Sequence, residues 1–382
     1  MDPNSQLLRR FPLVARPRPI AKPVAARIDD LCALADRAQR EDDLSAASAV
    51  LNQAALIASD CGQAELARRW CHDHANAYLL PARPLGAQAA RHALEPLVNL
   101  ARLHIRDGNG DAAHRILASL FQAVSTRTDT LIDDYPLAAS RLTWNGTDHR
   151  DVRQWLWGVL LADGTRALTS AGRWRDAYDH LKRHKGIGQR MLDGRQVAII
   201  AHLLAGEAKD ARTIITQTAS GDPWEEAVTG CLAYLSNAGK PDKTLLDAML
   251  DRYRRLTPTP SLAVFHTRLA LSIIDAGDGV DKPESRSLAT DLIGQALVIK
   301  DAYVAGQLLE HEGILSVIGA QSKAALAGLR GAGGSPCSQS LAVPLDRLLQ
   351  PLAISSSVIH RLVPAKPSST EPRPTDHRYR TE

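Results

Sequence analysis

Aromatic residues are scarce in this chain. They make up 4% of 382 residues, and only three are phenylalanine, although hydrophobic residues amount to 45%. Alanine and leucine supply most of the apolar content, and both are strong helix formers, whereas strands prefer β-branched and aromatic side chains. Alternating period-two runs bounded by turn residues are also missing. We therefore expect an all-α protein without strands.

An excess of one charge and long hydrophobic runs are missing as well. The net charge is only +4, and basic and acidic residues are interspersed, whereas a nucleic-acid surface needs positive charge on one face. No stretch of 18 uncharged apolar residues occurs, and the N-terminus has no apolar h-region, so we expect neither a membrane span nor a secretory signal. The scattered cysteines suit a reducing cytoplasm. They are Cys32, Cys61, Cys71, Cys231 and Cys337.

Catalytic and metal-binding signatures are also lacking. The sequence has no Gly-x-Ser-x-Gly motif and no P-loop. Cys61, Cys71, His72 and His74 lie close in sequence, but on a helix His72 points away from the face that Cys71 and His74 share, and the spacing matches no zinc module. We expect no catalytic residues, no metal site and no cofactor, and we favour a role other than catalysis.

The two ends of the chain differ from its middle. Residues 1–24 contain five prolines and five basic residues, which predicts a flexible basic arm. Residues 331–382 begin with a Gly-rich hinge and end in a Pro/Ser/Thr-rich stretch, which predicts a largely disordered tail around one short apolar segment at 345–362. Helical periodicity runs through residues 25–330 between them.

An internal repeat organises this middle region. The segment AGRWRDAYDHL from Ala171 aligns with AGEAKDARTII from Ala205 at an offset of 34 residues. A glycine just past a helix supplies the left-handed residue that ends it, so each copy predicts a turn between two helices. The same pattern is expected at four further positions, which are Glu41, Gly108, Ala238-Gly239 and Ala276-Gly277.

The repeats resemble the tetratricopeptide (TPR) family over roughly residues 27–310. The best matching positions are Ala167, Gly172, Trp174, Ala177 and Leu181. The pattern is similar to the ligand-sensing repeat domains of actinobacterial helix-turn-helix regulators, but no DNA-binding head precedes it here. This resemblance implies helix-turn-helix units stacked into a right-handed α-solenoid with a concave groove, closed by a capping helix at Ile314–Leu329.

The segment HKGIGQRMLDGRQ, residues His184–Gln196, is a candidate ligand site. Its backbone amides lie near a helix start among basic side chains, a combination that can hold a phosphate or a carboxylate. The alternative is a connector in which glycines serve turn geometry and Arg195 pairs with an acid. The candidate residues are Lys185, Arg190, Asp193, Arg195 and Gln196.

The segment WNGTDHRDVRQWLWG, residues Trp144–Gly158, is a second candidate because it concentrates three tryptophans. Trp155 and Trp157 cannot both face the core, so one of them lines the groove or packs between repeats. Thr147 or Asp148 is expected to cap the following helix. The candidate residues are Asn145, His149, Trp155 and Trp157.

The sequence favours a cytoplasmic binding or regulatory protein that captures a peptide segment, a protein partner or a small ligand in the concave groove. One alternative is an enzyme, or an enzyme subunit, that binds an anionic, phosphate-bearing substrate. A second alternative is a regulator that contacts nucleic acid through residues 1–24, and we favour it least.

Overall fold

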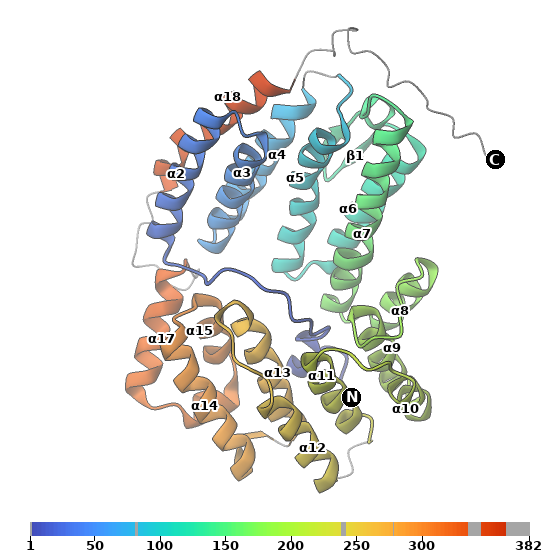
Figure 1. Cartoon of the computed structure of the whole chain (residues 1–382), viewed down its shortest axis with the longest axis vertical. Coiled ribbons are helices and arrows are strands. Elements are labelled where there is room, and N and C mark those ends of the chain that lie inside the picture. The colour runs from blue at the N-terminus through green and yellow to red at the C-terminus, as the bar shows by residue number, and fades with distance from the viewer. Residues whose placement is uncertain (1, 81–82, 238–241, 278, 335–344, 364–382) are drawn as a thin grey trace, which may run out of the picture.

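The computed structural model describes residues 2–80, 83–237, 242–277, 279–334 and 345–363. These residues form eighteen α-helices, which confirms the expected all-α class (Figure 1). The expectation of no strands was wrong at one place, where β1 (Thr130–Ile132) and β2 (Tyr135–Leu137) form an antiparallel hairpin. The hairpin is short, and Ile132, Tyr135 and Leu137 are the side chains that it buries.

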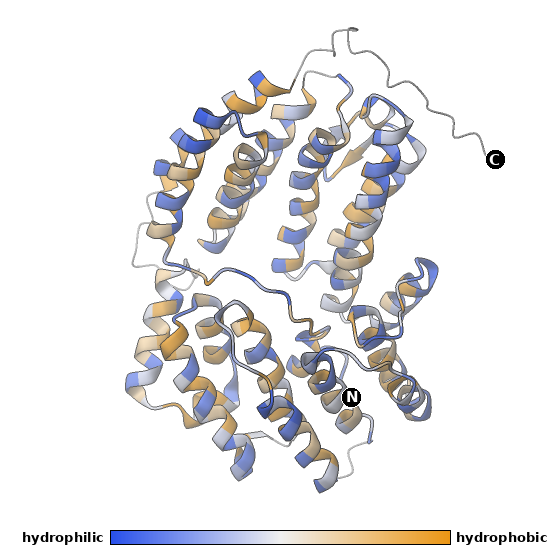
Figure 2. Cartoon of the chain, viewed as in Figure 1, coloured by the Kyte–Doolittle hydropathy of each residue, from blue (hydrophilic) through white to orange (hydrophobic). Residues whose placement is uncertain are grey.

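Six consecutive helices form a first group, and each packs against the next one along the chain (Figure 1). They are α2 (Val24–Glu41), α3 (Leu44–Asp60), α4 (Ala64–Leu79), α5 (Ala87–Arg106), α6 (Gly110–Thr126) and α7 (Gly146–Ser170). Their apolar faces share one core, and Figure 2 shows orange faces directed between neighbouring helices. Repeated burial of one face per helix is the pattern expected of stacked amphipathic helices.

Ten further helices form a second group around a separate core. They are α8 (Trp174–Arg183), α9 (Asp193–Leu204), α10 (Ala208–Thr216), α11 (Pro223–Leu235), α12 (Lys243–Arg254), α13 (Ala263–Ala276), α14 (Pro283–Ile299), α15 (Ala302–Leu309), α16 (Glu312–Val317) and α17 (Ala320–Ala332). The single capping helix expected at Ile314–Leu329 is divided between α16 and α17. The break lies at Ile318 and Gly319, where the backbone is extended.

The predicted glycine turns separate paired helices. Gly108, Gly172 and Gly206 have φ angles of 77°, 72° and 79°, and in each case the next helix begins two residues later. A side chain would be strained in this left-handed conformation. Gly62 makes the same turn between α3 and α4 with a φ of 74°, a copy that the repeat alignment missed.

The remaining copies of the repeat differ in which residue adopts the left-handed conformation. At the Glu41 copy, Asp42 takes the left-handed conformation in place of glycine, with a φ of 53°. At the Ala276 copy, Gly277 has a φ of −89°, and Gly279 is the left-handed residue. The Ala238-Gly239 copy lies outside the described residues.

The N-terminal residues are packed rather than flexible. Leu8, Phe11 and Leu13 are 0%, 4% and 2% exposed and belong to the second core. The short helix α1 (Gln6–Arg9) lies just before them. The prediction of a flexible arm from its composition was wrong, because burial of three apolar side chains anchors the Pro-rich segment.

The C-terminal segment returns to the opposite group. After a short 3-10 turn (Leu345–Leu348), α18 (Leu349–Leu362) packs on α2 and α3, and Leu348, Val358 and Ile359 are buried in the first core. This helix corrects the prediction of a largely disordered tail for the part of the tail that is described. Residues 335–344 and 364–382 lie outside the described residues.

None of the described helices combines the length and the apolar character that a membrane crossing requires.

Three histidines meet where α6, α7 and α8 pack together. The ring of His180 lies 5.4 Å from that of His114 and 4.7 Å from that of His184. The Nε2 atom of His180 is 3.1 Å from the carbonyl oxygen of Leu160. Burial, and then the neighbouring His184, lowers the pKa of His180 to about 4. Burial in the first core similarly lowers the pKa of His74 to about 3.

We expect acidification to destabilise the fold through these histidines. Their unfolded-state pKa is near 6.5, and burial lowers the pKa of His180 and His74 in the folded state. The unfolded chain therefore binds more protons, so stability is complete above pH 6.5 and falls as the pH drops toward the folded pKa values. Between pH 7 and pH 5, each of the two should account for a loss of about 2 kcal/mol, measured by urea unfolding.

A His180→Gln variant should show a weaker dependence of stability on pH. His360→Gln is the matched control, because His360 is exposed on α18. If the wild type and His180→Gln lost stability equally between pH 7 and pH 5, the assignment to His180 would be wrong.

Candidate functional site

The N-terminal residues 2–23, called the arm from here on, cross the space between the two helix groups (Figure 1). The Nη1 atom of Arg10 lies 2.5 Å from Oδ2 of Asp275, at the end of α13. The backbone amide of Arg18 donates to the carbonyl of Ser261, just before α13 begins, at 2.9 Å. The arm therefore runs antiparallel to α13.

One glutamine side chain holds the centre of the arm. Gln196, on α9, is fully buried, and its Oε1 accepts a hydrogen bond from the amide of Leu13 at 2.7 Å. Its Nε2 donates to the carbonyl of Leu13 at 2.7 Å and to that of Met191 at 3.0 Å. A side-chain amide thus satisfies both backbone groups of one arm residue, as a neighbouring strand would. This contact recognises extended backbone and not a particular side chain.

Acidic side chains receive the arginines of the arm. Arg16 pairs with Asp193 at 2.7 Å. Arg18 pairs with both oxygens of Asp301 at 2.9 and 3.1 Å, and its guanidinium lies 4.5 Å from the ring centre of Tyr303. Asp301 is 2% exposed, so its charge needs this partner.

Asp275 carries a second contact besides Arg10. His311 Nε2 lies 2.9 Å from Oδ1 of Asp275. Burial opposes ionisation of this carboxyl, but the hydrogen bonds from His311 and Arg10 outweigh burial and lower the pKa of Asp275. Asp275 is therefore held as an anion at the end of α13, where it fixes the start of the arm.

Asp60 links the two helix groups directly. It is nearly buried at the end of α3 and accepts ion pairs from Arg27 at 2.8 Å and Arg106 at 2.7 Å. The hydroxyl of Tyr303, on α15, donates to the same carboxylate at 2.7 Å. One acid from the first group thereby bonds a residue of the second group beside the arm.

Two of the sequence-predicted site residues meet the arm, namely Asp193 and Gln196. Two others, Arg195 and Arg190, contact residues near the connector and not the arm. Arg195 is 8% exposed and donates to the carbonyls of Gly188 and Ile214 and to the hydroxyl of Thr218, at 2.7 to 2.8 Å. The alternative prediction, in which Arg195 pairs with an acid, was wrong, because the partners of Arg195 are these neutral oxygens.

Arg190 pairs with Asp222 at 2.8 Å and with the buried Glu225. This contact ties the connector before α9 to the start of α11. Lys185 is exposed and has a φ of 55° in the turn after α8. Neither residue reaches the arm.

The tryptophan segment lies on the first half of α7, whereas Leu168, near the other end of α7, belongs to the second core. Trp155 is half-buried against the first core, and Trp157 is 39% exposed. Asn145 accepts from the amides of Thr147 and Asp148 at 2.8 and 2.9 Å, so Asn145 is the cap and the prediction of Thr147 or Asp148 was wrong.

His149 is half-buried on the first turn of α7. Burial, and then the positive charges of Arg127 and Arg153, lowers its pKa. The four predicted residues of this segment therefore lie at the N-cap and on the first half of α7, whereas Asp193 and Gln196 lie on α9.

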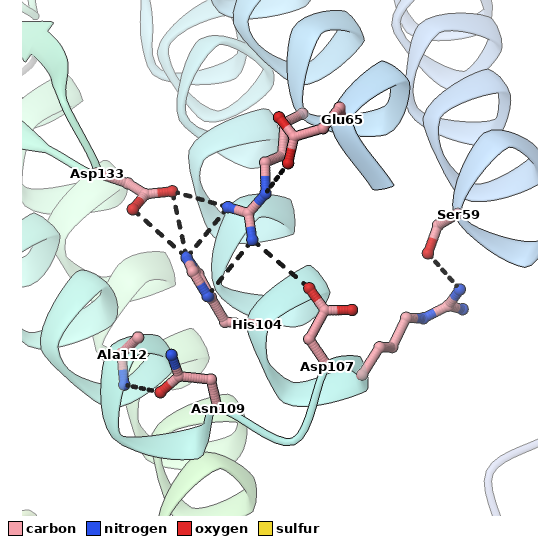
Figure 3. A network of polar contacts seen from close by, with 9 residues as sticks. Ser59, Glu65, His104, Asp107, Asn109, Ala112 and Asp133 are labelled. Carbon is pink, nitrogen blue, oxygen red and sulfur yellow. Dashed lines mark hydrogen bonds and ion pairs between the residues drawn. The ribbon is translucent and has the colours of Figure 1, made fainter. Parts of the chain in front are cut away.

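A separate polar network connects α4, α5 and the hairpin (Figure 3). Arg68 lies 3.2 Å from Asp133 and 3.1 Å from the ring of His104, and His104 lies 3.3 Å from Asp133. Asp133 and Asp134 form the hairpin turn with φ angles of 47° and 66°. Two successive left-handed residues without glycine are strained, and the contacts of Asp133 compensate part of that strain.

Comparison with protein-family models, with curated proteins and with solved structures found no match for this chain.

Removing the Gln196 side chain is expected to loosen the arm. In Gln196→Ala, the buried amide and carbonyl of Leu13 lose their partners, which costs about 1–3 kcal/mol. Trypsin should then cleave after Arg9 and Arg10 at least about tenfold faster, because cleavage follows the population of the open form. Gln189→Ala, at an exposed position, is the control. Unchanged cleavage in Gln196→Ala would show that the clamp does not hold the arm.

Glycine at the hairpin turn is expected to stabilise the fold. Asp134 is exposed and left-handed, so Asp134→Gly should raise the free energy of unfolding by about 0.5–1 kcal/mol, measured in urea. Asp133→Gly relieves the same strain but removes the contacts with Arg68 and His104, and its gain should be smaller. A destabilised Asp134→Gly variant would contradict the strain argument.

Proposed function

We propose that the protein is a non-catalytic binding protein that captures an extended peptide segment of a partner. In this proposal, residues 25–330 form a TPR-like, right-handed α-solenoid. The glycine turns that separate paired helices at an offset of 34 residues support this reading. Free cysteines in the described part of the chain agree with a cytoplasmic location.

The single observation that carries the proposal is the way the chain holds its own arm. Gln196 bonds both backbone groups of Leu13, and the apolar side chains of Leu8 and Phe11 enter the second core. Backbone hydrogen bonds with a few buried anchors are the usual means by which proteins bind extended peptides. We call the surface that contacts the arm the arm groove. It is formed by α9, α13 and the start of α15.

The chemistry of the arm groove defines the segment that it fits. Three apolar anchors are spaced as leucine, aromatic three residues later and leucine two residues after that. Basic side chains should flank them, because Asp275, Asp193 and Asp301 lie along the groove. We therefore expect a basic, apolar partner segment. This is the reverse of the sequence-based prediction, in which basic groove residues face an acidic group.

The arm competes with any such partner. It is tethered to the groove, so its effective concentration is of millimolar order, and a partner must displace it or bind when it is open. Of the two alternatives, nucleic-acid binding by the arm is disfavoured, because Arg10, Arg16 and Arg18 already face acids. No arrangement of described side chains favours an enzyme over a binding protein.

A labelled peptide with the sequence of residues 2–18 tests the proposal by fluorescence anisotropy. The full-length Phe11→Ser/Leu13→Ser variant has a weakened arm and should bind the peptide at least about tenfold more tightly than the wild type does. A peptide with serine at the three anchor positions should not bind, and adding Gln196→Ala to the variant should weaken binding. Absence of peptide binding to a variant that keeps a helical circular dichroism spectrum would refute the proposal.

A further inference from the structure

The turn between α9 and α10 brings together three side chains of the kinds that bind metal ions. They are His202 on the last turn of α9, Glu207 just before α10 and Asp210 on the first turn of α10. One donor atom from each side chain lies within 4.8 Å of a donor atom from each of the other two. The Nδ1 atom of His202 is 2.6 Å from Oε2 of Glu207.

The backbone of the turn explains why these side chains meet. Gly206 takes the left-handed conformation with a φ of 79°, and its amide donates to the carbonyl of Leu203 at 3.1 Å. The amide of Glu207 donates to the carbonyl of His202 at 2.8 Å, which completes a Schellman motif and folds Glu207 back beside His202. Asp210 follows Glu207 by three residues, so both lie on the same side of the helix start.

The preceding copy of the repeat makes the same turn with different chemistry. The first residue after its turn glycine is Arg173, whose Nε atom lies 2.7 Å from Oδ2 of Asp176. These two positions match Glu207 and Asp210 in the alignment at an offset of 34 residues. One copy therefore places a cation of the chain itself beside the aspartate, and the other copy places a second acid there.

The acids of this turn lack a balancing cation from the chain. Glu207 forms its ion pair with His202, and Asp210 forms none with any residue that the structure describes. Two carboxylates beside a neutral imidazole carry a double negative charge. A divalent cation bound between them would balance that charge, as the guanidinium of Arg173 balances Asp176 in the preceding copy.

The ring of Tyr178, on α8, packs against the imidazole of His202. The two rings are T-shaped with their centres 5.2 Å apart. Arg175 and Lys182 lie over the same tyrosine ring, at 5.5 and 5.3 Å from its centre, and neither forms an ion pair with the acids of the turn. The side chain of His202 is only 16% exposed, whereas that of Glu207 is 43% exposed. The site therefore combines one well-packed imidazole with carboxylates that can move.

We propose that His202, Glu207 and Asp210 bind one divalent transition-metal ion such as zinc at the turn between α9 and α10. An imidazole nitrogen with two carboxylate oxygens suits zinc, whereas magnesium and calcium prefer oxygen ligands alone. Donors that share one zinc ion lie about 3–4 Å apart, because each zinc–ligand bond is about 2.1 Å long. Both acids are exposed, so small rotations of their side chains reach that spacing.

The bound ion would fasten the end of α9 to the start of α10, and water would complete its coordination. The proposal departs from the sequence-based expectation of no metal site, which rested on the spacing of residues around Cys71. The site lies at the opposite end of α9 from Asp193 and Gln196. It does not depend on the capture of a peptide in the arm groove.

Calorimetric titration with zinc chloride tests the site on the full chain, after treatment with EDTA and removal of the EDTA by dialysis. Zinc should bind to the wild type and raise its unfolding midpoint by mass action. Magnesium chloride at the same concentration should do neither, because magnesium prefers oxygen ligands. Absence of zinc binding to the wild type, or an equal response to zinc and magnesium, would overturn the proposal.

Asp210→Asn and His202→Gln assign the ion to this turn, because other histidines and cysteines of the chain can also bind zinc. Asp210→Asn leaves the contact between His202 and Glu207 in place, so its midpoint without zinc should stay close to that of the wild type. Each variant should bind zinc at least about tenfold more weakly, since even residues outside the ligand set contribute about that much to metal affinity.

Asp176→Asn is the matched control, because it changes the equivalent position of the preceding copy, where Arg173 is the partner. It should bind zinc as the wild type does. If Asp210→Asn and His202→Gln both kept the zinc affinity of the wild type, the ion would be bound elsewhere in the chain and the proposed site would be wrong.

Discussion

Charge balance governs how the two helix groups meet. The first and the second core are separate, and the arm and its arginines lie where they come together. Placing arginine in such a position is favourable only when an anion accompanies it, because an unpaired charge loses its hydration without compensation. Asp60, Asp275 and Asp301 provide most of those anions, and each is held in place by more than one donor. The position of the arm follows from these acids as much as from its three buried apolar side chains.

Local chemistry made the helical class and the turns predictable. Alanine and leucine indicated helices, and a glycine after a helix indicated a left-handed turn, which Gly172 and Gly206 adopt. The arm could not be predicted, because Leu8, Phe11 and Leu13 follow no helical or strand period. Their partners also lie far away in the sequence: Gln196 is 183 residues from Leu13, and Asp301 is 283 residues from Arg18. The hairpin was not predicted because Asp134 occupies the second turn position, where glycine is usual.

The candidate residues show the same difference between local chemistry and partners that are distant in the sequence. Asp193 and Gln196 belong to the arm groove. The sequence had indicated them for another reason, as part of a glycine-rich connector that would bind an anion. Their observed partner is a basic segment of the same chain. Arg190 and Arg195 were predicted to be free to bind a ligand, but each already donates to oxygens of its own region.

The arm packs in the second core and α18 packs in the first, and this arrangement constrains the order of folding during synthesis. Residues 8–13 are synthesised long before the core that receives them, which is assembled from residue 168 onward. The first core, in turn, includes residues 348–363, which emerge after every other described helix. The arm must therefore wait for the second core, and the first core must wait for α18, so packing cannot follow a simple N-to-C order. Exposed apolar faces on α2 and α3 therefore persist until α18 has been synthesised, and during that interval the nascent chain is open to chaperones and to aggregation.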